Sequence, residues 1–337
     1  MQHRSICLYS SVGDKQLFSR VGFYRDDVLA LSSRCSNVYA TNSLRDLFKL
    51  RPGLVVGYFY SKALLAAIIG RIIRAEVILT GGADQISPIL QKGIKLYIHR
   101  CLAFLCLLFA NKVLLSCTDD VHNFKNISLG ISRLSNKIKY APHVVQPSPL
   151  KGRTREPVPG EFHAFTICWM GSVENVVRKG VDRAIRLVAM LRDIGIDATL
   201  EVAGTGGPGL EYLQRIAEEL SVASAIRFLG PISEEEKNKK YSFGSVYIQL
   251  SLHEGFGVAA AEAFFSGMLV VHSNKGGLSD VIGESGYILD IEELVNSGAS
   301  GVHDFYRSFL KYRINHDHAT AEKKKYSINT RAKSFLL

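Results

Sequence analysis

Short apolar runs alternate with longer segments of helical length along most of this chain of 337 residues. In the first half the runs are rich in Val, Ile, Leu and Tyr, which is typical of strands buried on both faces of a parallel sheet. We expect strands at 5–10, 36–41, 53–59, 75–82, 111–117 and 137–143, with helices such as 61–74 and 92–110 between them. The pattern predicts a doubly wound α/β domain.

The alternation stops at 146–161, where "QPSPLKGRTREPVPGE" brings four prolines together with a Lys/Arg cluster. Such a stretch is typical of an extended linker. Alternation then starts again, with strands expected at 163–171, 198–204, 225–230, 245–251 and 268–274, and helices at 180–195, 209–220 and around 233–242. The expected division is an N-terminal domain (1–147), a linker (148–162), a second domain (163–305) and a helical C-terminal tail (306–337).

Charge is distributed unequally between the two halves. Residues 1–150 hold 19 Lys and Arg against 8 Asp and Glu, whereas the remainder holds 22 against 23. A basic half indicates an anionic partner or surface. The basic residues are scattered among apolar runs without a nucleic-acid motif, so we expect no nucleic acid. A phospholipid surface fits better, and a merely solvated basic face is the alternative.

The segment 92–110 contains an apolar run from Cys101 to Ala110, which is only ten residues long. A membrane-spanning helix needs about 20. Because Lys92, Lys95 and Arg100 precede the run, the helix either enters a lipid interface or packs against the sheet.

The six cysteines are scattered and form no C-x-x-C pair. The N-terminus carries an apolar run that fits a first strand better than an export signal. Both features predict a reducing, cytoplasmic compartment.

The stretch "HEGFGVAAAEAFFSGMLVV" (253–271) predicts a loop followed by a helix that starts at Val258. Gly255 and Gly257 allow a sharp turn and a close approach to a ligand. Ligands of open α/β sheets bind beyond the carboxyl ends of the strands, and a helix start attracts phosphate. Glu254 and Glu262 then lie where carboxylates can hold the hydroxyls on either side of a nucleotide-sugar diphosphate. Alternatively, both are ordinary surface residues.

This Glu-x7-Glu pattern, with "FFSGMLVV" and "GGLSDVIG" after it, resembles the donor-domain signature of retaining glycosyltransferases of family 4. The resemblance covers roughly 163–290 and implies the GT-B fold, in which two Rossmann-like domains face each other across a cleft. It implies that Glu254 contacts the transferred sugar and Glu262 the ribose. The backbone from Gly255 to Val258, around Phe256, would contact the sugar and diphosphate.

The family also has a phosphate-binding pattern of the type G-R-x(5)-K-G, and "MGSVENVVRKGVD" resembles it. Gly171 and the pair Lys179-Gly180 match, which implies that Lys179 binds the diphosphate. Ser172 occupies the usual arginine position, and Arg178 is a candidate substitute. Alternatively, Lys179 is only the flank of the helix expected to follow, although a cation at a helix start is unfavourable unless an anion is also there.

The sequence "VAGTGGPGLEYL" satisfies G-x-G-x-x-G through Gly204, Gly206 and Gly209. An NAD site would also need an acidic residue near the end of the next strand, and none appears before Glu234. The resemblance implies a glycine-rich loop facing the donor, and a plain strand–helix turn is the alternative.

In the first half the resemblance is looser. Asp84, within "ILTGGADQISP", is a candidate contact to the acceptor or the sugar, or else a helix cap. Gly13 is a candidate to offer backbone amides to a phosphate or to the acceptor. His143 is expected to be an interdomain side chain.

No metal ligand set or other cofactor is expected, and "HDH" at 316–318 lies in a polar tail. The leaving diphosphate would be stabilised by Lys179, helix amides and Arg178. No enzyme nucleophile is required, because the leaving phosphate can accept the acceptor's proton while attack occurs from the same face, as retention implies.

These features predict a metal-independent glycosyltransferase that moves a sugar from a nucleotide-diphosphate sugar to a glycan or lipid-linked acceptor. Polysaccharide or lipopolysaccharide synthesis on the inner face of the cell membrane is the expected setting. A nucleotide-sugar epimerase, a non-catalytic nucleotide-sugar-binding protein and a glycoside hydrolase using both glutamates are the alternatives.

Overall fold

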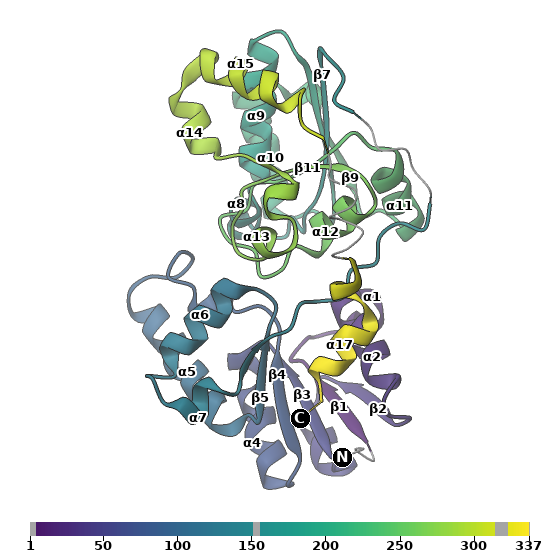
Figure 1. Ribbon diagram of the computed structural model, residues 1–337, viewed down its shortest axis with the longest axis vertical. Coiled ribbons are helices and arrows are strands. Elements are labelled where there is room, and N and C mark those ends of the chain that lie inside the picture. The colour runs from purple at the N-terminus through teal and green to yellow at the C-terminus, as the bar shows by residue number, and fades with distance from the viewer. Residues whose placement is uncertain (1–4, 151–155, 314–322, 337) are drawn as a thin grey trace. The chain divides into compact units, whose positions relative to one another are not determined.

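The computed structural model describes residues 5–150, 156–313 and 323–336. The chain forms two compact units, Met1–Val144 with Lys324–Leu337, and Val145–Lys323. Each is an α/β unit with a parallel sheet (Figure 1).

The first unit contains six parallel strands in the order β2-β1-β3-β4-β5-β6. They are β1 (Ile6–Tyr9), β2 (Val38–Thr41), β3 (Leu54–Tyr58), β4 (Glu76–Thr80), β5 (Lys112–Leu115) and β6 (Ile138–Tyr140). The helical elements are α1 (Leu17–Arg20), α2 (Gly22–Ser32), α3 (Leu44–Leu50), η1 (Tyr60–Ala63), α4 (Leu64–Ile72), η2 (Asp84–Ile86), α5 (Gly93–Phe109), α6 (Thr118–Ile127), α7 (Ser132–Ser135), η5 (Lys324–Tyr326) and α17 (Ile328–Ser334).

Alternate residues of these strands build two separate cores, one on each face of the sheet. On β1, Cys7 and Tyr9 join the core beneath α4, α5 and α6, whereas Ile6 and Leu8 join the core beneath α2 and α17. This follows from the period of two along a strand. Both faces are covered, as the uninterrupted apolar strands predict.

Helix α17 packs against α2 and so belongs to the first unit rather than to a separate C-terminal tail. Its Arg331 is 2% exposed and forms a bidentate ion pair with Asp27 of α2, at 2.6 Å (Nε–Oδ1) and 2.7 Å (Nη2–Oδ2). Arg331 also donates to the Ala141 carbonyl at 2.8 Å and to the Thr80 hydroxyl at 3.0 Å. A chain segment nearly 200 residues downstream of Ala141 therefore completes this core.

The second unit contains six parallel strands in the order β12-β11-β10-β7-β8-β9. They are β7 (Glu161–Ile167), β8 (Asp197–Ala203), β9 (Ile226–Gly230), β10 (Val246–Gln249), β11 (Leu269–His272) and β12 (Tyr287–Ile288). The helical elements are α8 (Val173–Lys179), α9 (Val181–Asp193), α10 (Pro208–Glu219), η3 (Ala223–Ala225), α11 (Glu234–Phe243), α12 (Val258–Phe265), α13 (Gly277–Val281), η4 (Gly283–Ser285), α14 (Ile291–Asn296) and α15 (Gly298–Phe309).

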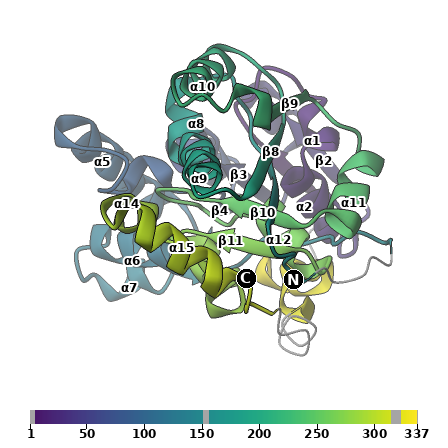
Figure 2. The same ribbon diagram turned by 90° about the horizontal axis from the view of Figure 1, so that it is seen from above.

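The strand order reverses between β7 and β10. From β7 the chain builds outward to β8 and β9, and it then returns to place β10 on the other side of β7. Because parallel crossovers are right-handed, α9 and α10, which precede this return, lie on one face of the sheet. Helix α11, which makes the return, and α12, which follows it, lie on the other face (Figure 2). The loops that follow β7 and β10 therefore flank a topological switch point, where ligands of such sheets bind.

Helix α5 packs by Ala103, Cys106 and Leu107 and leaves much of its remaining apolar surface exposed. Lys92 and Lys95 at its start are exposed as well. No helix among the described residues is both long and apolar enough to cross a bilayer.

Candidate functional site

The loops after β7 and β10 are joined through Gly180. This glycine has a left-handed backbone (φ 75°) between α8 and α9, and a Cβ there would lie 1.9 Å from the Leu250 carbonyl oxygen. Buried Arg183 adds a hydrogen bond from Nε to the same carbonyl at 2.9 Å and one from Nη2 to the Val177 carbonyl at 2.7 Å. These contacts fix the end of α8 against the loop that carries Glu254.

Lys179 and Glu254 meet as a result. Lys179 Nζ lies 2.5 Å from Glu254 Oε2, although the residues are 75 positions apart. The side chain of Lys179 remains 24% exposed, whereas that of Glu254 is 9% exposed. An ammonium with access to solvent thus lies beside a nearly buried carboxylate at the switch point.

The Glu254 carboxylate has two further donors on the same oxygen: Gln249 Nε2 at 2.6 Å and Ser251 Oγ at 3.4 Å. Burial alone would raise the pKa of Glu254, but the charges of Lys179 and Arg178 outweigh it and the pKa is lowered. Glu254 is therefore an anion at neutral pH. Sequence reasoning missed Gln249 and Ser251, although polar residues at the end of a buried strand are a usable signal.

The helix start that follows Glu254 is formed as predicted. Gly257 is the N-terminal cap of α12 and adopts φ 84°, a conformation that other residues adopt only with strain. The Glu254 carbonyl accepts the Gly277 amide at 2.7 Å, which ties the loop to the start of α13. The backbone of Gly255 and Phe256 leads directly from this anchored residue into the first turn of α12.

The structure adds a short helix in front of the predicted one. Helix α8 ends at Lys179, and the helix expected at 180–195 begins after Gly180 as α9. A cation is favourable in the last turn of a helix, so α8 offsets the unfavourable position of Lys179 before the start of α9. The sequence pattern missed α8 because seven residues carry too little periodicity to be recognised.

The other residues predicted to bind the donor on these loops mainly shape the backbone around the Lys179–Glu254 pair. Ser172 caps α8 by accepting the Asn175 amide at 3.2 Å, and Arg178 donates to Asn175 Oδ1 at 2.9 Å. Gly171 lies in the bend before α8. A Cβ on Gly204 would lie 1.9 Å from the Cys168 carbonyl oxygen, so this glycine allows the loop after β8 to pack against the end of β7.

Glu262 has a different environment from Glu254. It lies on α12, is 7% exposed and contacts Lys237 of α11, with Nζ 3.1 Å from Oε2. The Tyr241 hydroxyl lies 3.5 Å from the same oxygen. Glu262 is thus not the solvated helix residue of the alternative interpretation. Sequence reasoning missed Lys237 and Tyr241.

In the first unit, Asp84 lines a cavity of about 180 Å³ beyond the ends of β3 and β4. Ser61, Gln85 and His99 also line it, and Ser61 Oγ donates to Gln85 Oε1 at 2.7 Å. Gly13 lies in an exposed loop after β1, where its carbonyl accepts from Asn42 Nδ2 at 3.5 Å.

His143 is buried in the first unit, where desolvation and the charge of Arg331 lower its pKa to about 4. The "HDH" segment at 316–318 lies outside the described residues.

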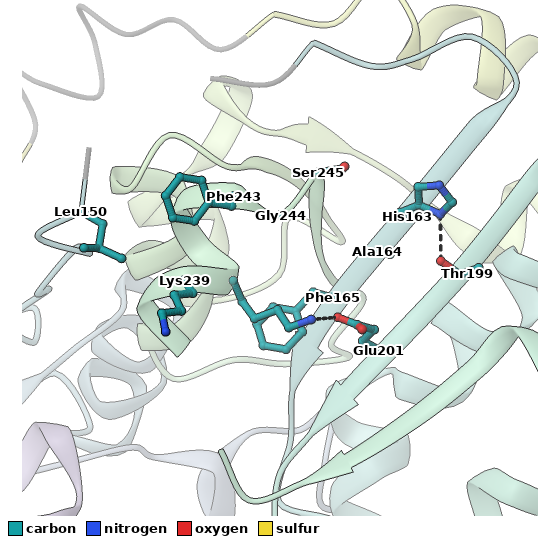
Figure 3. A pocket seen from close by; sticks show the side chains of 11 residues that line it. Leu150, His163, Ala164, Phe165, Thr199, Glu201, Lys239, Phe243, Gly244 and Ser245 are labelled. Atoms are coloured by element: carbon teal, nitrogen blue, oxygen red, sulfur yellow. Dashed lines mark hydrogen bonds and ion pairs between the residues drawn. The ribbon is translucent and has the colours of Figure 1, made fainter. Parts of the chain in front are cut away.

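A larger cavity of about 710 Å³ opens on the α11 face of the second sheet (Figure 3). His163 and Thr199, joined by a 2.9 Å hydrogen bond, line it together with Glu201 and Phe243. These positions belong to the bodies of β7 and β8 and the end of α11, so the cavity is distinct from the Lys179–Glu254 site.

Comparisons with known proteins give two kinds of similarity. Residues 165–303 match the family model described as Glycosyl transferases group 1. The D-inositol 3-phosphate glycosyltransferase of Corynebacterium jeikeium is 34% identical over 146 residues, which cover 41% of this chain and 34% of that protein. The GDP-mannose-dependent alpha-(1-6)-phosphatidylinositol monomannoside mannosyltransferase of Mycolicibacterium smegmatis is 34% identical over 125 residues, covering 34% of this chain and 32% of that protein. The chain thus spans about a third of the length of these relatives in the matched regions.

The solved structures extend the similarity to nearly the whole chain. Anabaena HepE in complex with UDP and glucose gives a TM-score of 0.70 at 13% identity and covers 98% of both chains. The apo form of the lipopolysaccharide outer core galactosyltransferase WaaB gives 0.63 at 15% identity, again covering 98% of both. Both are GT-B glycosyltransferases. The chain therefore has the GT-B fold, with its match to the group 1 glycosyltransferases in the second unit.

Proposed function

We propose that this chain is a retaining glycosyltransferase of family 4 that transfers a sugar from a nucleotide-diphosphate sugar. The carrying observation is the Lys179–Glu254 pair, which lies at the switch point of a donor-type domain directly before the start of α12. The cation and the helix start suit a diphosphate, and the ionised carboxylate between them suits a hydroxylated ring joined to it.

In this proposal Lys179 moves from Glu254 to the diphosphate when the donor binds, with Arg178 adding positive charge. The Glu254 carboxylate then accepts hydrogen bonds from hydroxyls of the sugar, and the Glu262 carboxylate accepts hydrogen bonds from the ribose hydroxyls. Backbone amides of Gly255, Gly257 and Val258, on either side of Phe256, donate hydrogen bonds to the sugar and the diphosphate. Backbone amides of Gly171, Ser172 and Gly204, in the loops after β7 and β8, donate to the same ligand. Stabilising the charge that develops on the diphosphate is the main catalytic contribution, and the proposed mechanism requires no metal ion.

The donor assignment predicts a selective stabilisation in a thermal-shift panel of UDP-, GDP- and ADP-sugars. One nucleotide class is expected to stabilise the protein by about 2.7 kcal/mol at 100 times its dissociation constant. The panel also identifies the base of the nucleotide. If none of the three classes stabilises the protein at millimolar concentration, the assignment fails.

Incubation with the labelled donor then separates the possible reactions. Transfer to an added glycan or lipid-linked acceptor supports a transferase. A changed sugar still attached to the nucleotide indicates an epimerase, and binding without turnover indicates a sensor. Cleavage of glycan substrates without any nucleotide would support the hydrolase instead.

The acceptor is proposed to bind to the first unit. The cavity lined by Asp84, Ser61 and His99 lies at the carboxyl ends of β3 and β4 and presents polar side chains beside Tyr60 and Phe59, a combination that suits a hydroxylated group. Gly13 lies in another loop at the same edge of the sheet. Polysaccharide or lipopolysaccharide synthesis in the cytoplasm is the proposed setting.

Helix α5 is proposed to lie on an anionic membrane surface. Ile94, Tyr97 and Ile98 are 76%, 67% and 52% exposed, and exposed Lys92 and Lys95 flank them. An apolar face of this size with cations at its border suits the headgroup region of an anionic bilayer. The same helix carries His99 in the wall of the cavity, which suits an acceptor attached to a lipid.

The membrane proposal predicts that Lys92→Glu/Lys95→Glu weakens binding to vesicles containing phosphatidylglycerol. Each lysine near an anionic surface contributes about 1 kcal/mol, so reversal of both charges is expected to reduce partitioning at least tenfold. Co-sedimentation at low and high salt measures this loss. Lys125→Glu/Arg133→Glu, at exposed positions of α6 and α7, provides a control of equal charge change. If both double variants bind equally, α5 is not the contact.

A further inference from the structure

Glu262 has a half-buried cationic partner on a neighbouring helix. Lys237 Nζ lies 3.1 Å from Glu262 Oε2, and the two side chains are only 16% and 10% exposed. The Tyr241 ring lies beneath the ammonium, with its centroid 5.9 Å away, and its hydroxyl reaches the same carboxylate oxygen. One face of α11 thus holds the carboxylate from two positions four residues apart.

The first turn of α11 determines where Lys237 lies. Ser233 and Glu236 form a capping box that fixes the start of α11. Glu234, three residues before Lys237, contacts its Nζ at 2.9 Å from the exposed side of the helix. Lys237 is therefore held between Glu234 and Glu262.

Lys237 keeps its positive charge although it is partly buried. Burial alone would lower the pKa of Lys237, but the charge of Glu262 and the contacts with Glu234 outweigh it, so the pKa is raised. Buried ion pairs are often no more stabilising than apolar side chains of equal volume. Stability alone is thus a weak reason for a lysine at this position, whereas a carboxylate that must be held in one orientation is a stronger one.

We propose that Lys237 is a positioning residue that orients Glu262 for the ribose hydroxyls of the donor and thereby selects ribonucleotides over 2′-deoxyribonucleotides. This inference rests on the proposed function. A carboxylate has about four acceptor positions. The contacts of Lys237 and Tyr241 converge on Oε2 and restrain the side chain, so that a diol meets a carboxylate already oriented for it, and less ordering is needed on binding.

The experiment measures binding of nucleoside diphosphates to the full chain by calorimetry. UDP is compared with 2′-deoxy-UDP, GDP with 2′-deoxy-GDP, and ADP with 2′-deoxy-ADP. The base whose ribonucleotide binds most tightly is then used for the variants. The wild type is expected to prefer the ribonucleotide about tenfold, as loss of one hydrogen bond to a charged group implies. Lys237→Met is expected to reduce that preference to about twofold or less, mainly by weakening ribonucleotide binding, and Lys237→Arg to restore most of it.

Lys239→Met is the matched control. Lys239 lies on the same helix but is 59% exposed and pairs with Glu235 at 2.7 Å. Its loss removes one charge from α11 without touching Glu262, so the wild-type preference should remain.

The outcomes separate this inference from the function on which it rests. If Lys237→Met binds with an unchanged preference, or loses both nucleotides of a pair equally, the inference is overturned while donor binding stands. If the wild type binds none of the three pairs, the proposed function fails as well. Should Lys237→Met not fold, Lys237→Gln removes the charge with a polar side chain and is judged by the same preference.

Discussion

Glu254→Gln is expected to reduce glycosyl transfer by about 100- to 1,000-fold, the range that follows from removing one group that hydrogen-bonds the transition state in an active site. The amide retains the shape of the side chain but loses the negative charge that faces Lys179. We therefore expect the effect mainly in kcat, with nucleotide binding changed far less. Single-turnover assays with the donor identified by the thermal-shift panel provide the measurement.

Lys179→Met is expected to reduce transfer at least as strongly, but its interpretation needs a control. Removing the ammonium leaves the buried Glu254 carboxylate without its cation, which also destabilises the fold. The double variant Lys179→Met/Glu254→Gln removes both charges and should recover stability without recovering activity. Because the two residues act on one donor, their effects on kcat should be far from additive. Near-wild-type turnover in both single variants would refute the assignment.

Asp27→Ala is expected to destabilise the first unit by about 3–5 kcal/mol, the usual cost of breaking a buried ion pair by removing one partner. Arg331 would retain its charge at 2% exposure, and its remaining acceptors among the described residues would be the Ala141 carbonyl and the Thr80 hydroxyl. The Tyr58 hydroxyl, which donates to Asp27, would lose that partner too. This loss is a large share of the stability of a typical domain.

Hydrogen exchange read by mass spectrometry is the suitable measurement, because a chain of two units need not unfold in one step. Peptides from β1 and β3 should exchange faster in Asp27→Ala, whereas peptides from β8 and β10 should not. Asp27→Leu/Arg331→Met, which replaces the pair by apolar side chains, should recover much of the protection. Unchanged exchange in β1 would show that the pair does not hold α17 in place.

The sequence predicted the strands well because both sheets are parallel and buried, so each strand is a continuous apolar run. It also placed Glu254 and Gly257 in a loop and helix start after β10, which the strand pattern alone determines. The resemblance indicated Lys179. Its contact with Glu254 depends on the strand order, which brings the loops after β7 and β10 together. The catalytic and binding roles of these residues stay predictions.

Other parts of the site could not be predicted from the sequence. The contact of Lys237 with Glu262 depends on how α11 packs against α12, and packing angles between helices are not encoded in local periodicity. The ion pair of Arg331 with Asp27 joins residues 304 positions apart. Nothing in the polar segment around Arg331 distinguishes a buried helix from a solvated one.

The position of α17 also has a consequence for biosynthesis. The ribosome must translate all of Val145–Lys323 before the residues that complete the first unit emerge. During that interval the apolar patch around Tyr24, Leu31 and Tyr58 lacks Ala332 and Phe335, which cover it in the native protein. At about 5–20 residues per second the delay lasts roughly 10–40 s. For this time the nascent chain exposes an apolar surface that chaperones can bind. The sheet of the second unit, although it is translated later, can form before the first unit is complete.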